Sequence, residues 1–203
     1  MNYPDFKEEK RLHKKGYDVV AGIDEVGRGP LAGPVVACAF CLKWKGSMDS
    51  RFKRVRDSKQ LSAKEREEIF NLLKRAPGAQ WGIGRVSEKT IDRINIFEAT
   101  KLAMKKAVEN LKEKPGFLLI DGNFGINVDA PQKPIVKGDQ KVFSIAAASI
   151  MAKVTRDRIM ARYHKKYPEY SFDRHKGYPT ELHRIAINKH GLCRIHRKTF
   201  HIS

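Results

Sequence analysis

Residues 22–35 read Gly22-Ile-Asp-Glu-Val-Gly-Arg-Gly-Pro-Leu-Ala-Gly-Pro-Val35, a stretch in which two acidic residues end an apolar run. The apolar run, Asp18–Ile23, is typical of a short buried strand, and the glycines and prolines that follow predict a turn. Adjacent residues of a strand point to opposite faces, so Asp24 and Glu25 can share one site only where the strand turns. Gly27 and Gly29 permit that turn. The stretch therefore predicts a buried strand that ends in a pair of carboxylates.

Strands and helices alternate outward from this stretch. Apolar runs predict strands at Asp18–Ile23, Val35–Leu42, Gln80–Val86, Phe117–Ile120 and Pro134–Val136. Periodicity and capping residues predict helices at residues 5–15, Ser62–Arg75, Ile96–Lys112, Ser144–Tyr167 and Thr180–His190. The segments Lys43–Lys59 and 122–134 are predicted to be loops. Strands followed by helices indicate an α/β domain with a mixed sheet.

A chain of 203 residues fits one domain, and we expect residues 1–203 to form a single unit. Its core is expected at about 18–165, and a basic helical extension at about 166–203. From Lys153 to Ser203 there are 13 Lys or Arg residues against 4 Asp or Glu. This part is therefore predicted to supply much of a surface that binds a phosphate backbone.

The charge of the chain indicates the kind of partner. Lys and Arg number 41 against 23 acidic residues, for a net charge of +18 and a pI near 9.9. Such an excess favours nucleic acid, although a basic surface that serves only solubility stays open. A membrane surface is disfavoured, because no basic helix has a broad apolar face.

Three cysteines, an odd number, argue against a secreted disulfide framework. Cys38 and Cys41 form one C-x-x-C pair, but they lie within the apolar run Pro34–Leu42, and no second pair follows at zinc-site spacing. They are predicted to be buried thiols. The N-terminus is charged, and no apolar stretch reaches membrane-spanning length, so we expect a cytoplasmic protein.

Four carboxylates stand in unusual places for so basic a chain. Asp24 and Glu25 end one apolar strand, Asp121 ends another, and Asp139 lies in a Gly-containing turn before a helix. Strand ends in α/β sheets are where ligand-binding loops converge. Clustered carboxylates repel one another unless cations neutralise them, and Mg²⁺ prefers such oxygen ligands. Asp121 could instead be a turn former and Asp139 a helix cap, so the pattern alone leaves a metal-dependent enzyme acting on nucleic acid as one of several hypotheses.

Longer motifs add a resemblance that covers nearly the whole chain. The stretch 22–35 resembles the signature of the ribonuclease HII family, the bacterial type 2 ribonucleases H. The resemblance continues, in family order, in the blocks Asp57-Ser-Lys-Gln-Leu-Ser62, Ile94-Asn-Ile96, Leu119-Ile-Asp-Gly-Asn123, Lys137-Gly-Asp139, Ser144-Ile-Ala-Ala-Ala-Ser-Ile-Met-Ala-Lys-Val-Thr-Arg-Asp-Arg158, His175-Lys-Gly-Tyr-Pro-Thr180 and His196-Arg-Lys-Thr-Phe200. One departure is Val26, which stands where Ala is common in the signature.

The resemblance implies a ribonuclease H-like fold, with a central mixed β-sheet flanked by helices and additional C-terminal helices. It places the metal ligands and catalytic residues at Asp24, Glu25, Asp121 and Asp139, with Mg²⁺ or Mn²⁺ as cofactor and two ions in the substrate complex. The implied reaction is hydrolysis of the phosphodiester 5′ of a ribonucleotide, which leaves a 3′-hydroxyl and a 5′-phosphate. The implied role is to excise misincorporated ribonucleotides from duplex DNA and to remove RNA from RNA–DNA hybrids.

The resemblance also implies substrate contacts. The turn Gly27-Arg28-Gly29 would read the ribose 2′-hydroxyl, and Tyr178 would stack on the neighbouring deoxyribose. Further candidates lie in matching blocks, where each could contact a phosphate or be a solvated surface residue: Lys59, Asn95, Lys153 and Lys176. Ser144 and Ser149 could serve the substrate or only cap and pack a helix.

Three hypotheses follow for function. The first is the ribonucleotide-directed endonuclease, the second a nuclease of the same fold that cuts other nucleic acids, and the third a basic protein that binds RNA or hybrids without cutting them. The Gly27–Gly29 turn and Tyr178 favour the first over the second, and the four carboxylates favour an enzyme over a binder. A monomer is expected, because no apolar stripe is left over for an interface.

Overall fold

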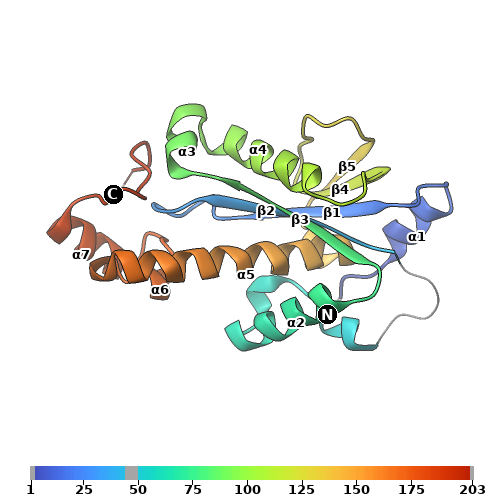
Figure 1. Ribbon diagram of the computed structural model, residues 1–203, viewed down its shortest axis with the longest axis horizontal. Coiled ribbons are helices and arrows are strands. Elements are labelled where there is room, and N and C mark those ends of the chain that lie inside the picture. Colours follow the sequence, from blue (N-terminus) through green and yellow to red (C-terminus); the bar gives the residue numbers. More distant parts are fainter. Residues whose placement is uncertain (1–2, 44–49, 202–203) are drawn as a thin grey trace.

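A five-stranded mixed sheet forms the centre of the protein, with strand order β3-β2-β1-β4-β5 (Figure 1). The computed structural model describes residues 3–43 and 50–201, without the side chain of Arg51. The strands are β1 (Val20–Val26), β2 (Val35–Leu42), β3 (Ala79–Val86), β4 (Phe117–Asp121) and β5 (Gln132–Ile135). β2 is antiparallel to both β1 and β3, whereas β1, β4 and β5 are parallel. The carboxyl ends of β1 and β4 therefore lie at the same edge of the sheet.

Helices cover both faces of this sheet, which gives three layers (Figure 1). One face carries α3 (Glu88–Ile94) and α4 (Ile96–Glu109), and the other carries α2 (Ala63–Arg75) and the long α5 (Phe143–Lys166). The remaining elements are α1 (Lys7–His13), α6 (Phe172–His175), α7 (Glu181–His190) and the 3-10 turns η1 (Ser50–Arg54), η2 (Ser58–Gln60), η3 (Gly138–Gln140) and η4 (Pro168–Tyr170). Within the described residues, the structure contains no helix with the length and apolar character that crossing a membrane requires.

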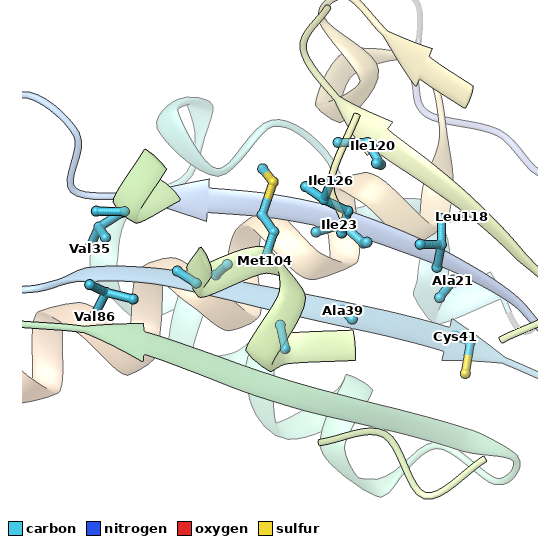
Figure 2. Packing of buried hydrophobic residues seen from close by; sticks show 14 of the residues in the cluster. Ala21, Ile23, Val35, Ala39, Cys41, Val86, Met104, Leu118, Ile120 and Ile126 are labelled. Carbon is cyan, nitrogen blue, oxygen red and sulfur yellow. The ribbon is translucent and has the colours of Figure 1, made fainter. Parts of the chain in front are cut away.

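The main core lies between the sheet and α4. Figure 2 shows Ala21, Ile23 and Ile120 from β1 and β4 in the same cluster as Met104 of α4. α4 approaches β3 closely because β3 has glycine where it meets the helix. A Cβ atom on Gly84 would lie only 1.8 Å from the carbonyl oxygen of Ala103. Glycine thus sets the distance between this helix and the sheet.

The two cysteines of β2 contribute to opposite faces of the sheet. Cys41 packs in the cluster beneath α4, and Cys38 packs in the cluster beneath α5. Strand alternation separates them, because three residues apart is an odd number of steps. Both are free and buried, which confirms the prediction of buried thiols.

Most predicted elements are present at nearly the predicted bounds, and the α/β class with a mixed sheet is confirmed. β2 matches its prediction residue for residue, and α5 and α7 each begin within one residue of theirs. The capping box predicted for α2 is formed by Ser62 and Glu65. These elements carry strong local signals, either long apolar runs or a capping residue followed by helical periodicity.

Other predictions were wrong in their bounds. β1 continues to Val26, so Asp24 and Glu25 lie within the strand, where β2 supplies hydrogen-bonding partners. The predicted loop Lys43–Lys59 contains the turns η1 and η2, and Phe52 and Val55 are buried there, while residues 44–49 lie outside the described residues. β5 begins two residues earlier than predicted. α3, η4 and α6 were not predicted, because segments this short have too few residues to show a period.

Candidate active site

Asp24 and Glu25 lie side by side in β1, paired with Cys38 and Ala37 of β2. On its other side, β1 pairs with β4 only as far as Ile23, opposite Ile120. The chain leaves β4 after Asp121, at Gly122, whose φ of +111° suits glycine. The end of β1 therefore projects beyond its parallel neighbour. The two carboxylates therefore lie on the part of β1 that pairs with β2 alone, and not at a turn.

Asp121 and Asp139 are joined through the η3 turn. The Asp121 Oδ1 atom accepts a 2.6 Å hydrogen bond from the backbone N–H of Gly138. A Cβ atom on Gly138 would lie 2.6 Å from Ile145 Cδ1 and 3.3 Å from Asp121 Oδ1. Glycine at this position therefore permits the carboxylate to approach the turn. Asp139, the next residue, is buried.

The pKa values show that the four carboxylates influence one another. Burial raises the pKa of Asp24 well above its ordinary value, and the charges of Glu25 and Asp121 raise it further. Burial also raises the pKa of Glu25, against the opposing effect of the Arg28 cation. The pKa of Asp139 is raised by burial and then by the charge of Asp121. Asp121 thus links the pair on β1 to Asp139, and the structure brings all four together.

The donor set fits a hard divalent cation. All four side chains offer oxygen, and the Glu25 Oε2 atom is buried without a hydrogen-bond partner among the described residues. The set is not preassembled, because no three or more His, Cys, Asp or Glu side chains of the described residues converge on one possible metal position. Two of the carboxylates have other partners in this structure: Asp24 Oδ1 accepts the N–H of Glu25 at 2.7 Å, and Glu25 Oε1 lies 3.4 Å from Arg28 Nη1.

The turn after β1 meets the loop that contains Tyr178. Gly27 has φ +95°, in the left-handed region, and Arg28 is exposed. A Cβ atom on Gly29 would lie 3.9 Å from Tyr178 Cε1, and 38% of the Tyr178 surface is exposed. Two segments about 150 residues apart in the chain therefore lie in contact beside the carboxylates. The aromatic ring is open to a ligand next to the turn.

The four predicted phosphate contacts differ in their surroundings. Lys59 is exposed, and its charge acts to lower the pKa of Asp139, so it lies near the carboxylates. Lys176 precedes Gly177 in the Tyr178 loop. Lys153 forms a 2.9 Å ion pair with Asp157, and the Asn95 Oδ1 atom caps α4. No contact of Asn95 or Lys153 with the carboxylates is present among the described residues.

Two residues from the Asp57-Ser58-Lys59 block also lie at the site, where sequence reasoning had singled out only Lys59. The Ser58 and Ser149 hydroxyls are 3.0 Å apart, and Ser149 hydrogen-bonds Asp24 and acts to lower its pKa. Asp57 is buried, and its charge raises the pKa of Asp139. The sequence predicts a loop for Lys43–Lys59, and nothing in the composition of the block shows that Asp57 and Ser58 are buried.

Comparison with known proteins assigns the chain to a family. The family model described as Ribonuclease HII matches residues 21–202. Ribonuclease HII of Clostridioides difficile (strain 630) is 50% identical over 204 residues, covering 96% of this chain and 78% of that protein. The crystal structure of ribonuclease H2 from Pyrococcus horikoshii OT3 is similar with a TM-score of 0.73 and 29% identity, over 91% of this chain and 94% of that one.

A more distant structure shares the fold. Bst-RNase HIII, solved in complex with Mn²⁺, has a TM-score of 0.66 and 19% identity, over 94% of this chain and 69% of that one. The family model covers every block that carried the resemblance, and the ribonuclease HII relative covers nearly the whole chain. On this evidence the chain belongs to the ribonuclease HII family.

Proposed function

We propose that this protein cuts the phosphodiester on the 5′ side of a ribonucleotide, in RNA–DNA hybrids and at single ribonucleotides within duplex DNA. Members of the ribonuclease HII family are endonucleases of RNA–DNA hybrids, and the products expected from the family's chemistry are a 3′-hydroxyl and a 5′-phosphate. The observation that carries the proposal is the group of four interacting carboxylates near the place where the turn after β1 meets the Tyr178 loop, through the hydrogen bond from the N–H of Leu31 to the carbonyl of Gly177. The carboxylates can bind a divalent cation, and the turn beside them can contact the ribose of the substrate.

Asp24, Glu25, Asp121 and Asp139 are proposed to hold two divalent ions, Mg²⁺ or Mn²⁺. When bound, such ions activate a water molecule and stabilise the leaving oxygen in phosphodiester hydrolysis. The carboxylates of this chain would bind the ions and, through them, fix the scissile phosphate. Burial and mutual repulsion make the ion-free cluster unfavourable, as the raised pKa values of Asp24 and Asp139 indicate, so the site favours cations.

The Gly27-Arg28-Gly29 turn is proposed to read the 2′-hydroxyl, the group that distinguishes RNA from DNA. Without side chains at 27 and 29, the backbone groups of the turn can approach a ribose directly. Arg28 is exposed and can bind a phosphate with its planar guanidinium group. Tyr178 presents its exposed ring beside Gly29, where it can stack on the next sugar of the strand.

Basic residues around the site are proposed to bind the backbone of the duplex. Lys59 lies near Asp139, and Lys176 lies in the loop that carries Tyr178, where its ammonium group donates to the carbonyl of Asp173. Lys153 and Asn95 remain candidates of lesser support, because an ion pair and a helix cap already occupy them. A net charge of +18 makes the electrostatic part of binding strong and salt-dependent.

One chain supplies every group in this scheme, which supports the proposal of a single catalytic domain that acts as a monomer. The described core and the C-terminal helices α6 and α7 share contacts rather than forming separate units, since α5 packs against α6. All three cysteines are free, which suits a reducing compartment such as the cytoplasm.

A direct assay distinguishes the three candidate functions. A DNA duplex with one ribonucleotide, an all-DNA duplex and an RNA–DNA hybrid are incubated with the protein in Mg²⁺ or in EDTA. We expect cleavage in Mg²⁺ alone, 5′ of the ribonucleotide, with the all-DNA duplex intact. Equal cutting of all-DNA duplex would favour a nuclease without ribose recognition, and tight binding without cleavage would favour a non-catalytic binder.

A further inference from the structure

Two arginines are buried beneath the turn that follows β1. Arg156 of α5 and Arg197 of the C-terminal segment are 0% and 1% exposed, and they are among the largest fully buried side chains. Their hydrogen bonds, among the contacts of the described residues, run to backbone carbonyl oxygens rather than to carboxylates. The charge of each guanidinium group is therefore held by peptide dipoles.

Arg197 joins the two ends of the turn. Its Nη2 atom donates to the carbonyl oxygen of Gly27 at 2.6 Å and to that of Gly33 at 2.9 Å. Its Nη1 atom donates to the carbonyl oxygen of Arg28 at 2.9 Å, and its Nε atom to Gly33 at 3.0 Å. One planar group thus fixes the carbonyls of Gly27 and Arg28 relative to Gly33.

Arg156 joins the same turn to the Tyr178 loop. Its Nε and Nη2 atoms donate to the carbonyl oxygens of Pro34 and Ala32, at 2.9 Å and 3.1 Å, and its Nη1 atom donates to that of Lys176 at 3.0 Å. Its Cζ atom also lies 5.9 Å from the centre of the Tyr178 ring. Arg156 therefore links the segment after β1 to the Tyr178 loop, alongside the backbone hydrogen bond from the N–H of Leu31 to the carbonyl of Gly177 at 2.8 Å.

The segment that carries Arg197 is itself held at both ends. The backbone N–H of Arg197 donates to the carbonyl of Leu31 at 2.8 Å. Beyond Arg197, the Asp92 carboxylate of α3 accepts the N–H groups of Lys198 and Thr199, each at 3.1 Å, and the Thr199 hydroxyl at 2.8 Å. In Figure 1 α3 and α7 lie at the same end of the molecule. Asp92 thus anchors the Arg197 segment from the surface.

Burying two cations without carboxylate partners costs free energy, and apolar side chains of similar volume would fill the space at a lower cost. Burial lowers the pKa of Arg156 to about 10 and that of Arg197 to about 9, so both remain protonated at neutral pH. What the planar guanidinium groups add is a set of hydrogen bonds in fixed directions. Costly polar groups of this kind are expected where geometry matters for function.

We propose that Arg156 and Arg197 are positioning residues that hold the Gly27–Gly29 turn and the Tyr178 ring in the geometry that recognises a ribonucleotide. They touch no substrate group, and they act through the backbone carbonyls that they bind. The inference rests on the proposed function, because it assumes that the turn reads the sugar. It predicts that discrimination between ribose and deoxyribose depends on the several hydrogen bonds that each planar guanidinium group donates, and not on its charge alone.

The test uses Arg197→Lys and Arg156→Lys, which keep the charge but cannot reach several carbonyls at once. Without metal, Kd is measured for a duplex with one ribonucleotide and for the same duplex in all-DNA form, and the ratio of the two values measures discrimination. In Mg²⁺, kcat and KM are measured for cleavage of the duplex with one ribonucleotide. In each variant we expect the ratio of the two Kd values to fall toward one while the all-DNA Kd stays within about twofold. We expect kcat/KM to fall by about 10- to 100-fold, as for a misplaced recognition group.

Two further variants separate positioning from simple loss of stability. Leu73→Ala opens a cavity in α2 and lowers the Tm, but it is expected to leave the Kd ratio unchanged, because Leu73 packs in the cluster beneath α2 and α5. Asp92→Ala removes the hydrogen bonds that hold Lys198 and Thr199, next to Arg197, and is expected to lower the degree of discrimination measured by the two Kd values. This variant tests the inference even if a lysine variant fails to fold. A wild-type Kd ratio retained in all folded arginine and Asp92 variants would overturn the inference. Absence of ribonucleotide-dependent cleavage by the wild-type protein in Mg²⁺ would instead contradict the proposed function, and a wild-type Kd ratio of one would overturn the inference that the turn discriminates by binding.

Discussion

At the scale of single residues, the site depends on side chains whose charges are costly where they stand. Asp24 is buried within a strand, and its nearest charged neighbours include two other carboxylates. A buried carboxylate beside like charges destabilises the free protein, and the proposed metal ions would offset that cost. Tyr178 is the opposite case, because 38% of its surface is exposed beside a glycine turn, where a ligand could contact the ring.

Replacing Asp24 with Asn removes a proposed metal-binding oxygen and one of the mutually repelling charges. We expect cleavage of ribonucleotide-containing duplex to be lost, by at least about 10³-fold, because the ions would no longer be held in place. Binding of the duplex is expected to persist, and the Tm to stay level or rise, because a buried like charge is gone. Activity assays, fluorescence anisotropy and thermal unfolding measure these effects, with exposed Asp129→Asn as the matched control. Retained cleavage would remove Asp24 from the metal site.

Replacing Tyr178 with Ala removes the exposed ring while leaving the carboxylates intact. We expect kcat/KM to fall most on substrates with a junction between ribose and deoxyribose, by about 10-fold, and less on uniform RNA–DNA hybrids. The comparison of kcat/KM between the two substrates measures this effect, and Tyr178→Phe, which keeps the ring, is the control. An equal loss on both substrates would contradict a stacking role.

At the scale of elements, small residues decide how closely the layers approach. α5 packs on β1 because β1 has Gly22, where a Cβ atom would lie 2.2 Å from the backbone carbon of Ser144. α4 packs on β3 in the same way, over Gly82 and Gly84. These contacts position α5, which bears Ser149 and Arg156, against the strand that bears Asp24. The placement of the site therefore depends on glycines remote from the chemistry.

Gly84→Ala tests this dependence at the α4 interface. The added Cβ atom would lie 1.8 Å from the carbonyl oxygen of Ala103 and 2.7 Å from the backbone N of Ala107, so the helix must move. We expect the free energy of unfolding to fall by about 1–3 kcal/mol or more, as for overpacked cores, measured as a lower midpoint in urea. Gly116→Ala is the control, because its nearest neighbouring atom would be 3.5 Å away. Equal midpoints for the two variants would show that α4 adjusts freely.

At the scale of the whole molecule, the C-terminal quarter of the chain closes around three buried histidines, His175, His183 and His196. Their hydrogen bonds assign each ring a neutral tautomer. His196 Nδ1 accepts the N–H of Cys193 at 2.9 Å, so its Nε2–H donates to His183 Nε2 at 3.0 Å, and His183 Nδ1–H donates to the carbonyl of Tyr178 at 2.9 Å. A further proton would break one of these bonds.

This cluster predicts loss of stability in mild acid. Burial, with smaller contributions from His175 and His196, lowers the pKa of His183 to about 4, from an ordinary value of 6.5. Above pH 6.5 neither the folded nor the unfolded form binds the proton. Between pH 6.5 and about 4 only the unfolded form does, so stability falls as the pH falls, by on the order of 2–3 kcal/mol for this one group.

Urea unfolding between pH 8 and pH 4.5 measures the effect, and His183→Asn should be less stable at pH 8 but lose less stability on acidification. The matched control is His201→Gln, at an exposed position, which is expected to follow the wild-type pH profile. If His183→Asn and the wild-type protein lose the same free energy between the two pH values, this histidine is not the group responsible.

The local sequence was sufficient to predict the α/β class, β2, α2, α5 and α7, because apolar runs and capping residues are signals contained in a few neighbouring residues. Motif resemblance was sufficient for the family, which the matched residues 21–202 confirm, and for the list of site residues, which stays a prediction. Resemblance needs only the order of residues along the chain, and it says nothing of where their side chains lie.

Only the tertiary structure decided how the carboxylates meet and which charges are buried. The pairing of β1 with β4 ends at Ile23, so Asp24 and Glu25 lie where the continuing strand pairs with β2 alone, although the sequence had indicated a turn there. Arg156 and Arg197 look like their basic neighbours in a chain with 41 Lys and Arg residues, yet they are buried. Burial and charge interactions depend on segments far apart in the chain, so no local pattern can show them. The pair of carboxylates was visible in the sequence, whereas its surroundings exist only once the sheet, α5 and the C-terminal segment pack together.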